Sequence, residues 1–292
     1  MPAKVTNVEK WFEENSQDFV PPVCNKCMYS DQLKMFFVGG PNQRRDYHLE
    51  EGEEVFYQLK GDMCLKVVER GVKRDLIIKE GEIFVLPGRV EHSPQRFENT
   101  IGAVVERTRN EEEIDCVRYF LDDTLNRQFE RWFHLDDVVK DLPPLIKGFH
   151  ASESFKSNTV TDESFATKAV YEPQEIDLDP PINLAQFVES HQEALKKGPV
   201  PLFGAPKYTS TTVLYGAGNY KLSSGHDEEI ILFHTEENLQ FPVKTGKAKF
   251  DSDNTVFTLG NNEMARVQPL NDLSLTVREG VVLEIRMPGK RK

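Results

Sequence analysis

The stretch DYHLEEGEEVFYQLKG, residues 46–61, places one histidine and five acidic residues directly before an unbroken apolar run. The apolar run is typical of a strand in a protein core, and the Lys-Gly pair that ends it is a turn signal. Such a strand does not ordinarily begin with a cluster of charges. We therefore expect His48 and one of the carboxylates, Glu54, to hold a metal ion.

A second stretch, GEIFVLPGRVEH at residues 81–92, supplies another histidine. Two imidazoles and one carboxylate suit Fe(II) with open coordination positions, and the same set can hold catalytic zinc. The first two residues are close in sequence and the third comes two strands later, which suits neighbouring strands of a barrel that face one interior point. Taken singly, each residue is better explained as a surface side chain. Their joint spacing predicts a metal site made of His48, Glu54 and His92.

Strand periodicity adds two arginines to this candidate site. Residues i, i+2 and i+4 of an extended strand share a face, so Arg44 points the same way as His48, and Arg96 the same way as His92. Four residues of strand span about 13 Å. We expect these arginines to reach part of the way back and to meet the far end of a ring-sized ligand whose near end lies at the metal.

A buried glutamate is predicted by the same reasoning in TIGAVVERTR, residues 100–109. Gly102, Val104 and Glu106 share one face of this strand, so Glu106 faces inward if Val104 does. An inward glutamate beside a metal pocket can accept a hydrogen bond or a proton. A plain salt bridge to a neighbouring arginine fits the strand parity equally well.

Composition limits the class of protein. The 292 residues are 38% hydrophobic and 29% charged, and the net charge of −12 argues against a nucleic-acid partner. The N-terminal residues lack the apolar core of a signal peptide, and no stretch approaches the ~18 apolar residues of a membrane span. We expect a cytoplasmic (cytosolic) protein with reduced thiols. A CxxC pair, CNKC at residues 24–27, lacks the second pair that a structural zinc site usually has, so Cys24 and Cys27 are expected to be ordinary thiols.

Strand-like runs fill both halves of the chain. Apolar residues at helical spacing occur at 138–149, although a Pro-Pro pair interrupts them, and a second helix is expected at 182–198. The polar stretch 157–181 reads as a linker. EEVFYQLKG at 53–61 resembles EEIILFHTEE at 228–237, and matching their polar ends places Ile230 at the position of Glu54. This internal similarity predicts a duplicated β-barrel in which one copy has a functional metal site and the other has lost it.

The two charged stretches resemble the motifs of the cupin family. Two positions depart from the usual pattern: Asp46 stands where a first histidine is common, and Arg89 where a glycine is common. The first departure leaves three ligands in place of four, which opens the metal further. The residues that meet the two motifs are Glu54, Gly61, Gly81, Pro87 and His92.

Longer stretches of sequence narrow the resemblance to one family of enzymes. GGPNQRRDYHLEEGEEVFYQLKGDM, GEIFVLPGRVEHSPQRF and ERWF are similar to 3-hydroxyanthranilate 3,4-dioxygenases of the eukaryotic type. The resemblance implies an all-β dominated bicupin, with two double-stranded β-helix (jelly-roll) barrels and a few flanking helices. Residues 1–160 would be the catalytic cupin, 161–180 a linker, and 181–292 a degenerate second cupin without a metal site.

The same resemblance implies a non-haem iron enzyme. If the second half packs against the first barrel in place of a partner subunit, the protein is a monomer. It would cleave the ring of 3-hydroxyanthranilate with O2, giving 2-amino-3-carboxymuconate semialdehyde for quinolinate and NAD synthesis in the kynurenine pathway. His48, Glu54 and His92 would bind Fe(II). Arg96 would pair with the substrate carboxylate, Glu106 would contact its polar ring groups along with Glu54, and Arg44 would lie beside dioxygen. A zinc-dependent cupin isomerase and a non-enzymatic binding protein remain the alternatives.

Overall fold

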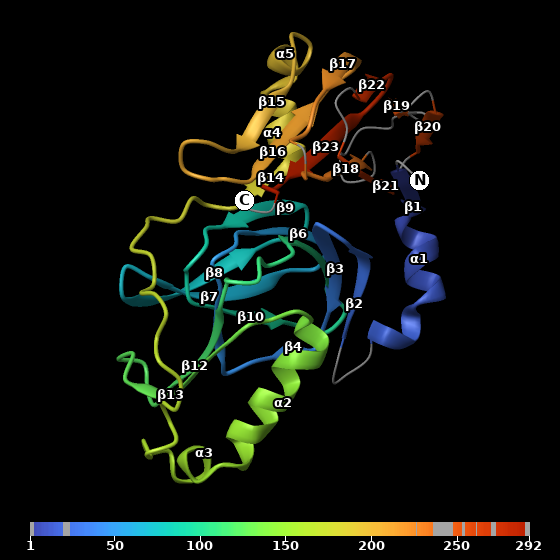
Figure 1. Cartoon of the computed structure of the whole chain (residues 1–292). Coiled ribbons are helices and arrows are strands. Elements are labelled where there is room, and N and C mark those ends of the chain that lie inside the picture. The colour runs from blue at the N-terminus through green and yellow to red at the C-terminus, as the bar shows by residue number, and fades with distance from the viewer. Residues whose placement is uncertain are drawn as a thin grey trace.

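The computed structural model describes residues 3–19, 24–225, 227–235, 248–252, 255–260, 262–269 and 273–289. Antiparallel sheets dominate it, and Figure 1 shows the first half of the chain in blue to green below the second half in yellow to red. The end of the internal similarity at 236–237 lies outside the described residues, so the alignment of Ile230 with Glu54 stays a prediction.

Two sheets, here called sheets I and II, build the first half. Sheet I has the order β13 (Arg127–Phe133), β12 (Asp115–Phe120), β5 (Tyr47–Leu49), β10 (His92–Arg96), β7 (Met63–Glu69) and β8 (Val72–Ile78), with β4 (Asn42–Gln43) paired to β10. Sheet II has the order β14 (Ile182–Asn183), β9 (Glu82–Leu86), β6 (Glu54–Lys60), β11 (Ile101–Arg107), β3 (Leu33–Gly39) and β2 (Asn25–Ser30).

Sheets III and IV build the second half. Sheet III has the order β1 (Ala3–Asn7), β21 (Glu263–Val267), β18 (Ile230–Thr235), β23 (Val281–Arg286), β16 (Thr211–Tyr215) and β15 (Val200–Phe203). Sheet IV has the order β17 (Gly218–Leu222), β22 (Leu273–Val277), β19 (Ala248–Ser252) and β20 (Thr255–Leu259). Each half lends a strand to the other, because β1 pairs with β21 and β14 pairs with β9. The predicted domain limits stay a prediction.

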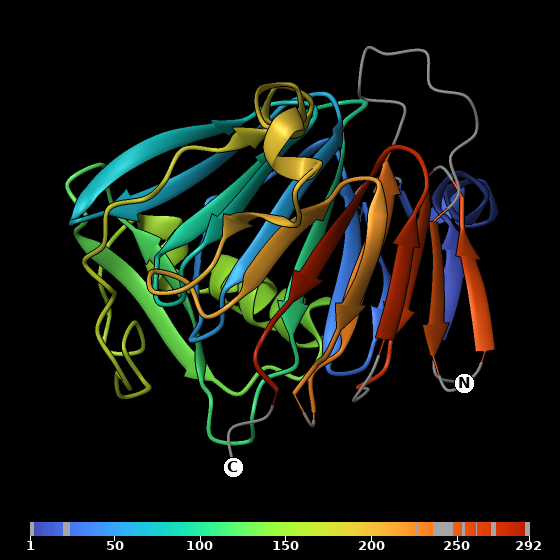
Figure 2. The same ribbon diagram turned by 90° about the horizontal axis from the view of Figure 1, so that it is seen from above.

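Figure 2 shows the sheets stacked one behind another, and apolar side chains fill the spaces between them. The first interior, between sheets I and II, contains Phe56 of β6. The interface layer, between sheets II and III, contains Val55 and Tyr57 of the same strand together with Phe233 of β18. The second interior, between sheets III and IV, contains Leu232. Strand β6 thus turns alternate side chains toward the first interior and toward the second half, as a period of two requires.

Helices cover the edges and the outer faces. α1 (Val8–Glu14) and the 3-10 turn η1 (Ser16–Phe19) pack aromatic rings beside sheet II, and α2 (Val138–Ala151) and α3 (Glu153–Ser157) cover sheet I. The predicted helix at 182–198 is broken at His191 into α4 (Leu184–Ser190) and α5 (Gln192–Leu195). No helix within the described ranges has the length and apolar character that a membrane crossing needs.

The segment between the halves, residues 158–181, contains only turns and irregular backbone. It runs along the first half and is tied to it by hydrogen bonds. Tyr171 donates to the carbonyl of Ile114 at 2.8 Å, and the Gln174 amide donates to the carbonyl of Arg89 at 2.7 Å. The segment is therefore packed against the surface rather than spanning open solvent between the halves.

Candidate metal centre

A cavity of about 110 Å³ opens into the first interior, between sheets I and II. Apolar side chains, among them Phe36, Phe56 and Val104, form much of its wall. The six residues singled out from the sequence all line it: Arg44, His48, Glu54, His92, Arg96 and Glu106. The structure therefore brings together in one place residues that are spread over more than sixty positions of the chain.

Three of these residues converge on one point. His48 of β5 and His92 of β10 are direct cross-strand partners in sheet I, and Glu54 begins β6 in sheet II opposite. A ligand atom from each of the three lies within 4.8 Å of the other two. His92 Nε2 lies 3.0 Å from Glu54 Oε1, and the imidazole centroids are 5.4 Å apart. All three side chains are buried.

Hydrogen bonds from outside the trio fix the orientation of each imidazole. His48 Nε2 lies 2.8 Å from Asp115 Oδ2, and His92 Nδ1 lies 2.9 Å from the carbonyl oxygen of Val90. Metal-binding histidines commonly donate one ring N–H to a carboxylate or carbonyl in this way. One nitrogen of each ring is left for a metal, so the donor set is two nitrogens and one carboxylate.

The charge of Glu54 also favours a metal ligand. Burial raises the pKa of this carboxyl, but His92, together with smaller contributions from Glu50 and His48, outweighs burial and holds the pKa below its ordinary value. A carboxylate that stays ionised in an apolar cavity needs a cation beside it. The two-histidine, one-carboxylate set is the donor chemistry of non-haem Fe(II) sites with open positions. The residues present fit a divalent metal.

A network of buried charges surrounds the trio. Arg109 is its centre, with nitrogens 2.7 Å from Glu50, 2.6 Å from Glu106 and 2.9 Å from Asp115. Burial raises the pKa of Glu50 well above its ordinary value; Arg109 opposes this rise, whereas the nearby carboxylate of Glu54 adds to it. Glu106 therefore both lines the cavity and forms an ion pair, so the two interpretations of its strand parity are compatible.

Arg96 lies in the same cavity and is 2% exposed. Burial lowers its pKa to about 10, although Glu54 opposes the shift. Its Nη1 lies 3.5 Å from Gln58 Oε1, and it forms no ion pair within the described ranges. Gly102 makes room for it, because a Cβ there would lie 2.6 Å from Arg96 Nη1. This buried cation is suited to an anionic ligand.

Arg44 differs from Arg96 because it already has a carboxylate partner. Its Nε lies 3.2 Å from both oxygens of Asp46, and Nη2 also contacts this group. Burial raises the pKa of Asp46, but the Arg44 guanidinium outweighs burial and keeps it low. The aspartate that departs from the usual cupin motif therefore holds Arg44 at the cavity wall.

Asp115, Arg109 and Glu50 were not singled out from the sequence. Asp115 begins β12, and Arg109 belongs to the charged loop before it, in which acidic residues look solvated. The available signal for Asp115 was its place at the start of a strand-like run, which is also the position of Glu54. Glu50 lies in the opening stretch itself, where its sequence context does not separate it from its exposed neighbours.

The fold and the site define a cupin with a metal-binding pocket in its first half. Residues 1–150 match the family described as 3-hydroxyanthranilic acid dioxygenase. The chain belongs to this family and is a dioxygenase.

Relatives extend the likeness beyond the first half. The chain is 50% identical over 287 residues to the 3-hydroxyanthranilate 3,4-dioxygenase of Caenorhabditis elegans, covering 98% of this chain and 99% of the relative. It is 46% identical over 213 residues to the enzyme of that name from Homo sapiens, covering 73% and 74%. The crystal structure of E. coli Ylba aligns over 100% of this chain and 93% of its own, with a TM-score of 0.51 and 6% identity, a likeness of fold alone. The predicted β-dominated cupin fold is confirmed, and two complete barrels stay a prediction.

Proposed function

We propose that this chain is an Fe(II)-dependent 3-hydroxyanthranilate 3,4-dioxygenase, with His48, Glu54 and His92 as the metal ligands. The convergence of these three side chains in a buried cavity carries the proposal, and the names of the relatives give the substrate. The product is 2-amino-3-carboxymuconate semialdehyde, which leads to quinolinate and NAD in the kynurenine pathway. We further propose that the chain acts as a monomer, because sheet III covers the face of sheet II that a partner subunit would otherwise use.

A ferrous ion, when bound, would supply the electron chemistry with O2 and lower the pKa of a hydroxyl bound beside it. The protein's own groups hold the substrate. Arg96 can grip a carboxylate with two parallel hydrogen bonds, and its burial strengthens that ion pair. The 3.5 Å contact with Gln58 keeps the guanidinium in the cavity before the ligand arrives. Binding at this point fixes which edge of the ring faces the metal ligands.

Glu106 and Arg44 act on the polar groups of the reaction. Arg109 donates to one oxygen of Glu106 at 2.6 Å, so the second oxygen can accept a hydrogen bond from the substrate's hydroxyl or amino group. Arg44 carries a positive charge at the cavity wall, where it would stabilise negative charge that develops on oxygen. Apolar walls such as Phe36 and Phe56 exclude water and strengthen these interactions.

The test is a single-turnover reaction. Metal-free protein is loaded anaerobically with Fe(II), mixed with 3-hydroxyanthranilate and exposed to air, while oxygen uptake and the absorbance of a ring-opened product are followed. We expect one O2 consumed for each product formed, and neither change with Glu54→Ala or without protein. Equal rates for the Zn(II)-loaded protein, or substrate binding without oxygen uptake, would contradict the proposal and favour the zinc-dependent or non-enzymatic alternatives.

A further inference from the structure

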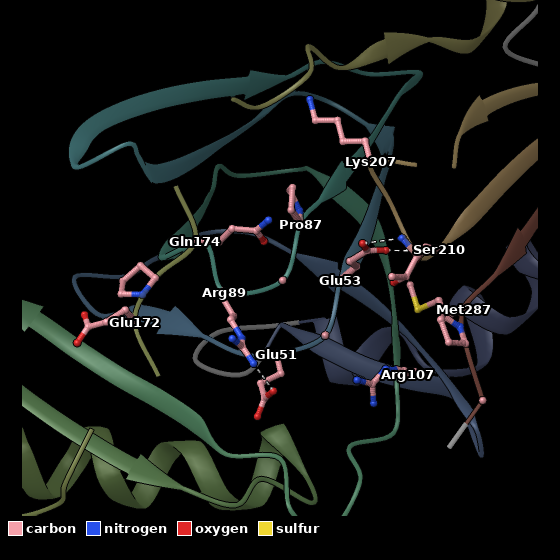
Figure 3. Close-up of a pocket in the computed structure, with 16 residues that line it drawn as sticks. Glu51, Glu53, Pro87, Arg89, Arg107, Glu172, Gln174, Lys207, Ser210 and Met287 are labelled. Carbon is pink, nitrogen blue, oxygen red and sulfur yellow. Dashed lines mark hydrogen bonds and ion pairs between the residues drawn. The ribbon is translucent and has the colours of Figure 1, made fainter. Parts of the chain in front are cut away.

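A cleft of about 720 Å³ lies where the two halves meet (Figure 3). The first half contributes two short loops to it, residues 51–53 and 87–89. The first loop ends directly before the proposed ligand Glu54, and the second lies three residues before His92. The cleft therefore adjoins the loops that lead into the metal centre, on the side of the second half.

The two loops are fastened to each other. The Arg89 amide donates to the carbonyl of Glu50 at 2.6 Å, and Arg89 Nη2 lies 2.8 Å from Glu51 Oε2. A Cβ at Gly88 would lie 2.3 Å from the carbonyl oxygen of Glu51, so only glycine permits this approach. A shift of one loop would therefore move the other as well.

Glu53 connects this loop pair to the second half. Its Oε1 accepts a hydrogen bond from the Thr209 amide at 2.9 Å, and its Oε2 accepts one from the Ser210 amide at 2.6 Å. Figure 3 shows Glu53 extending toward Ser210 across the cleft. Hydrogen bonds to an ionised carboxylate are roughly twice as strong as neutral ones. The next residue, Glu54, points into the first interior instead. Two consecutive side chains at the start of β6 therefore point in opposite directions, Glu53 toward the second half and Glu54 toward the metal centre.

The segment that receives Glu53 is itself well anchored. Tyr208, directly before the two amides, is 4% exposed and packs edge-on against Phe203 at 5.4 Å. Its hydroxyl donates to Asp179 at 2.8 Å, and Lys207 Nζ lies 2.7 Å from the same carboxylate. The two amides therefore follow residues that are anchored both to Phe203 of β15 and to the segment between the halves.

We propose that Glu53 is a positioning residue for the metal centre. The second half holds the Glu53 carboxylate, and this contact sets the place from which Glu54 reaches the metal. The inference rests on the proposed function for the identity of Glu54 as a ligand. It gives the second half a task in a reaction whose chemical groups all lie in the first half.

The test measures metal affinity rather than turnover. Co(II) is titrated anaerobically into the metal-free full-length chain, and its visible spectrum reports both affinity and coordination geometry. Glu53→Ala should raise the Co(II) dissociation constant about tenfold or more and change the spectrum, since losing a residue that orients a ligand typically costs 10–100-fold in affinity. Glu53→Gln keeps one acceptor oxygen, so its affinity should lie between those of Glu53→Ala and the wild type.

Gln32→Ala is the matched control. Gln32 also bridges the halves, donating to the carbonyl of Pro288 at 3.1 Å and accepting from the Glu229 amide at 2.8 Å. It lies in the turn between β2 and β3, which contains none of the proposed ligands. Its loss should change Co(II) affinity by less than about twofold, far below the usual cost of losing a ligand-orienting residue. An unchanged affinity in Glu53→Ala, or an equal loss in Gln32→Ala, overturns the proposal.

A second measurement separates this inference from the proposed function. If the wild type and Glu54→Ala bind Co(II) equally weakly, the proposed function has failed. Hydrogen exchange of the metal-free chain then decides the role of Glu53. Amide exchange across residues 53–57 should rise in Glu53→Ala and stay as in the wild type in Gln32→Ala. Exchange that is unchanged in Glu53→Ala overturns the positioning role.

Discussion

The first and second interiors of this molecule are built from different chemistry. The first holds buried charges, with Arg96, Glu54 and His92 at or below 7% exposure around a cavity. The second is mainly an apolar layer in which Leu232 and Val282 are fully buried. Buried charges cost free energy that a well-packed apolar core does not. The first interior therefore bears a cost in free energy, set by its chemistry, that the mainly apolar second interior bears to a smaller extent.

The largest expected effect comes from removing the carboxylate of the first interior that we propose as a metal ligand. Glu54→Ala should lose the metal and lower kcat about a thousandfold or more, because a bound metal contributes several kcal/mol to such a reaction. The matched control is Glu284→Gln, which changes the fully buried glutamate of β23 in the second half. Metal content and kcat of the two purified variants are the measurements. Equal losses in both would erase the distinction between the two interiors.

A substitution that disturbs packing in the second interior should lower stability and leave metal binding and kcat unchanged. Leu232→Ala removes a fully buried side chain and should lower the free energy of unfolding by about 2–5 kcal/mol. Metal affinity and kcat should stay at wild-type values well below the melting temperature, since Leu232 does not line the cavity. Thermal unfolding and steady-state kinetics on the same preparation test both statements. A loss of kcat without a loss of stability would refute them.

Arg96→Lys tests whether the first interior binds the substrate carboxylate through Arg96. Lysine keeps the charge but cannot form the two-pronged carboxylate contact, so KM should rise about 10–100-fold, the range expected for a hydrogen bond to a charged group. Arg70→Lys is the control, because Arg70 is exposed and pairs with Asp177 at 2.5 Å on the surface. Substrate titration of both variants is the measurement. An unchanged KM in Arg96→Lys would remove Arg96 from substrate binding.

The proposed metal ligands could be found from the sequence because their motifs carry local geometry. A histidine before a strand, a glutamate at its start and a second histidine on a neighbouring strand converge only if the barrel closes, and the glycines and proline between them signal those turns. Strand parity extended the set to Arg96 and Glu106, which lie in β10 and β11, because a period of two needs no knowledge of the rest of the fold. Arg44 lies between β4 and β5 and not in a strand, so its contact with Asp46, and not strand parity, accounts for its place at the cavity wall.

The remaining features depend on contacts that no local pattern encodes. Arg109 becomes the centre of a buried network only because β12 brings Asp115 next to His48. The pairing of β1 with β21 joins residues about 260 positions apart, and no periodicity predicts a partner at that distance. From the sequence, Glu53 resembles the solvated acidic residues around it. Only the fold shows that its carboxylate accepts a hydrogen bond from the Thr209 amide.

The smallest expected effect is a pH dependence that belongs to the second interior. Burial raises the pKa of Glu284, and the adjacent Arg286 does not cancel the rise. Because the pKa of Glu284 is higher in the folded than in the unfolded state, its contribution to stability is complete below the ordinary pKa of about 4.5. That contribution is lost as pH rises through the folded-state pKa. The loss is about 1.4 kcal/mol for each unit by which the two pKa values differ. Glu284→Gln cannot ionise, so its melting temperature relative to the wild type should increase as pH rises through that window.

Asp179→Asn should show the opposite sign. Burial raises the pKa of Asp179, but Lys207 and Tyr208 outweigh burial and lower it, so the stability that this carboxylate contributes is lost as pH falls. Melting curves of the three proteins from acid to neutral pH test this, and parallel curves for Glu284→Gln and the wild type would mean that the second interior does not hold a carboxyl with a raised pKa.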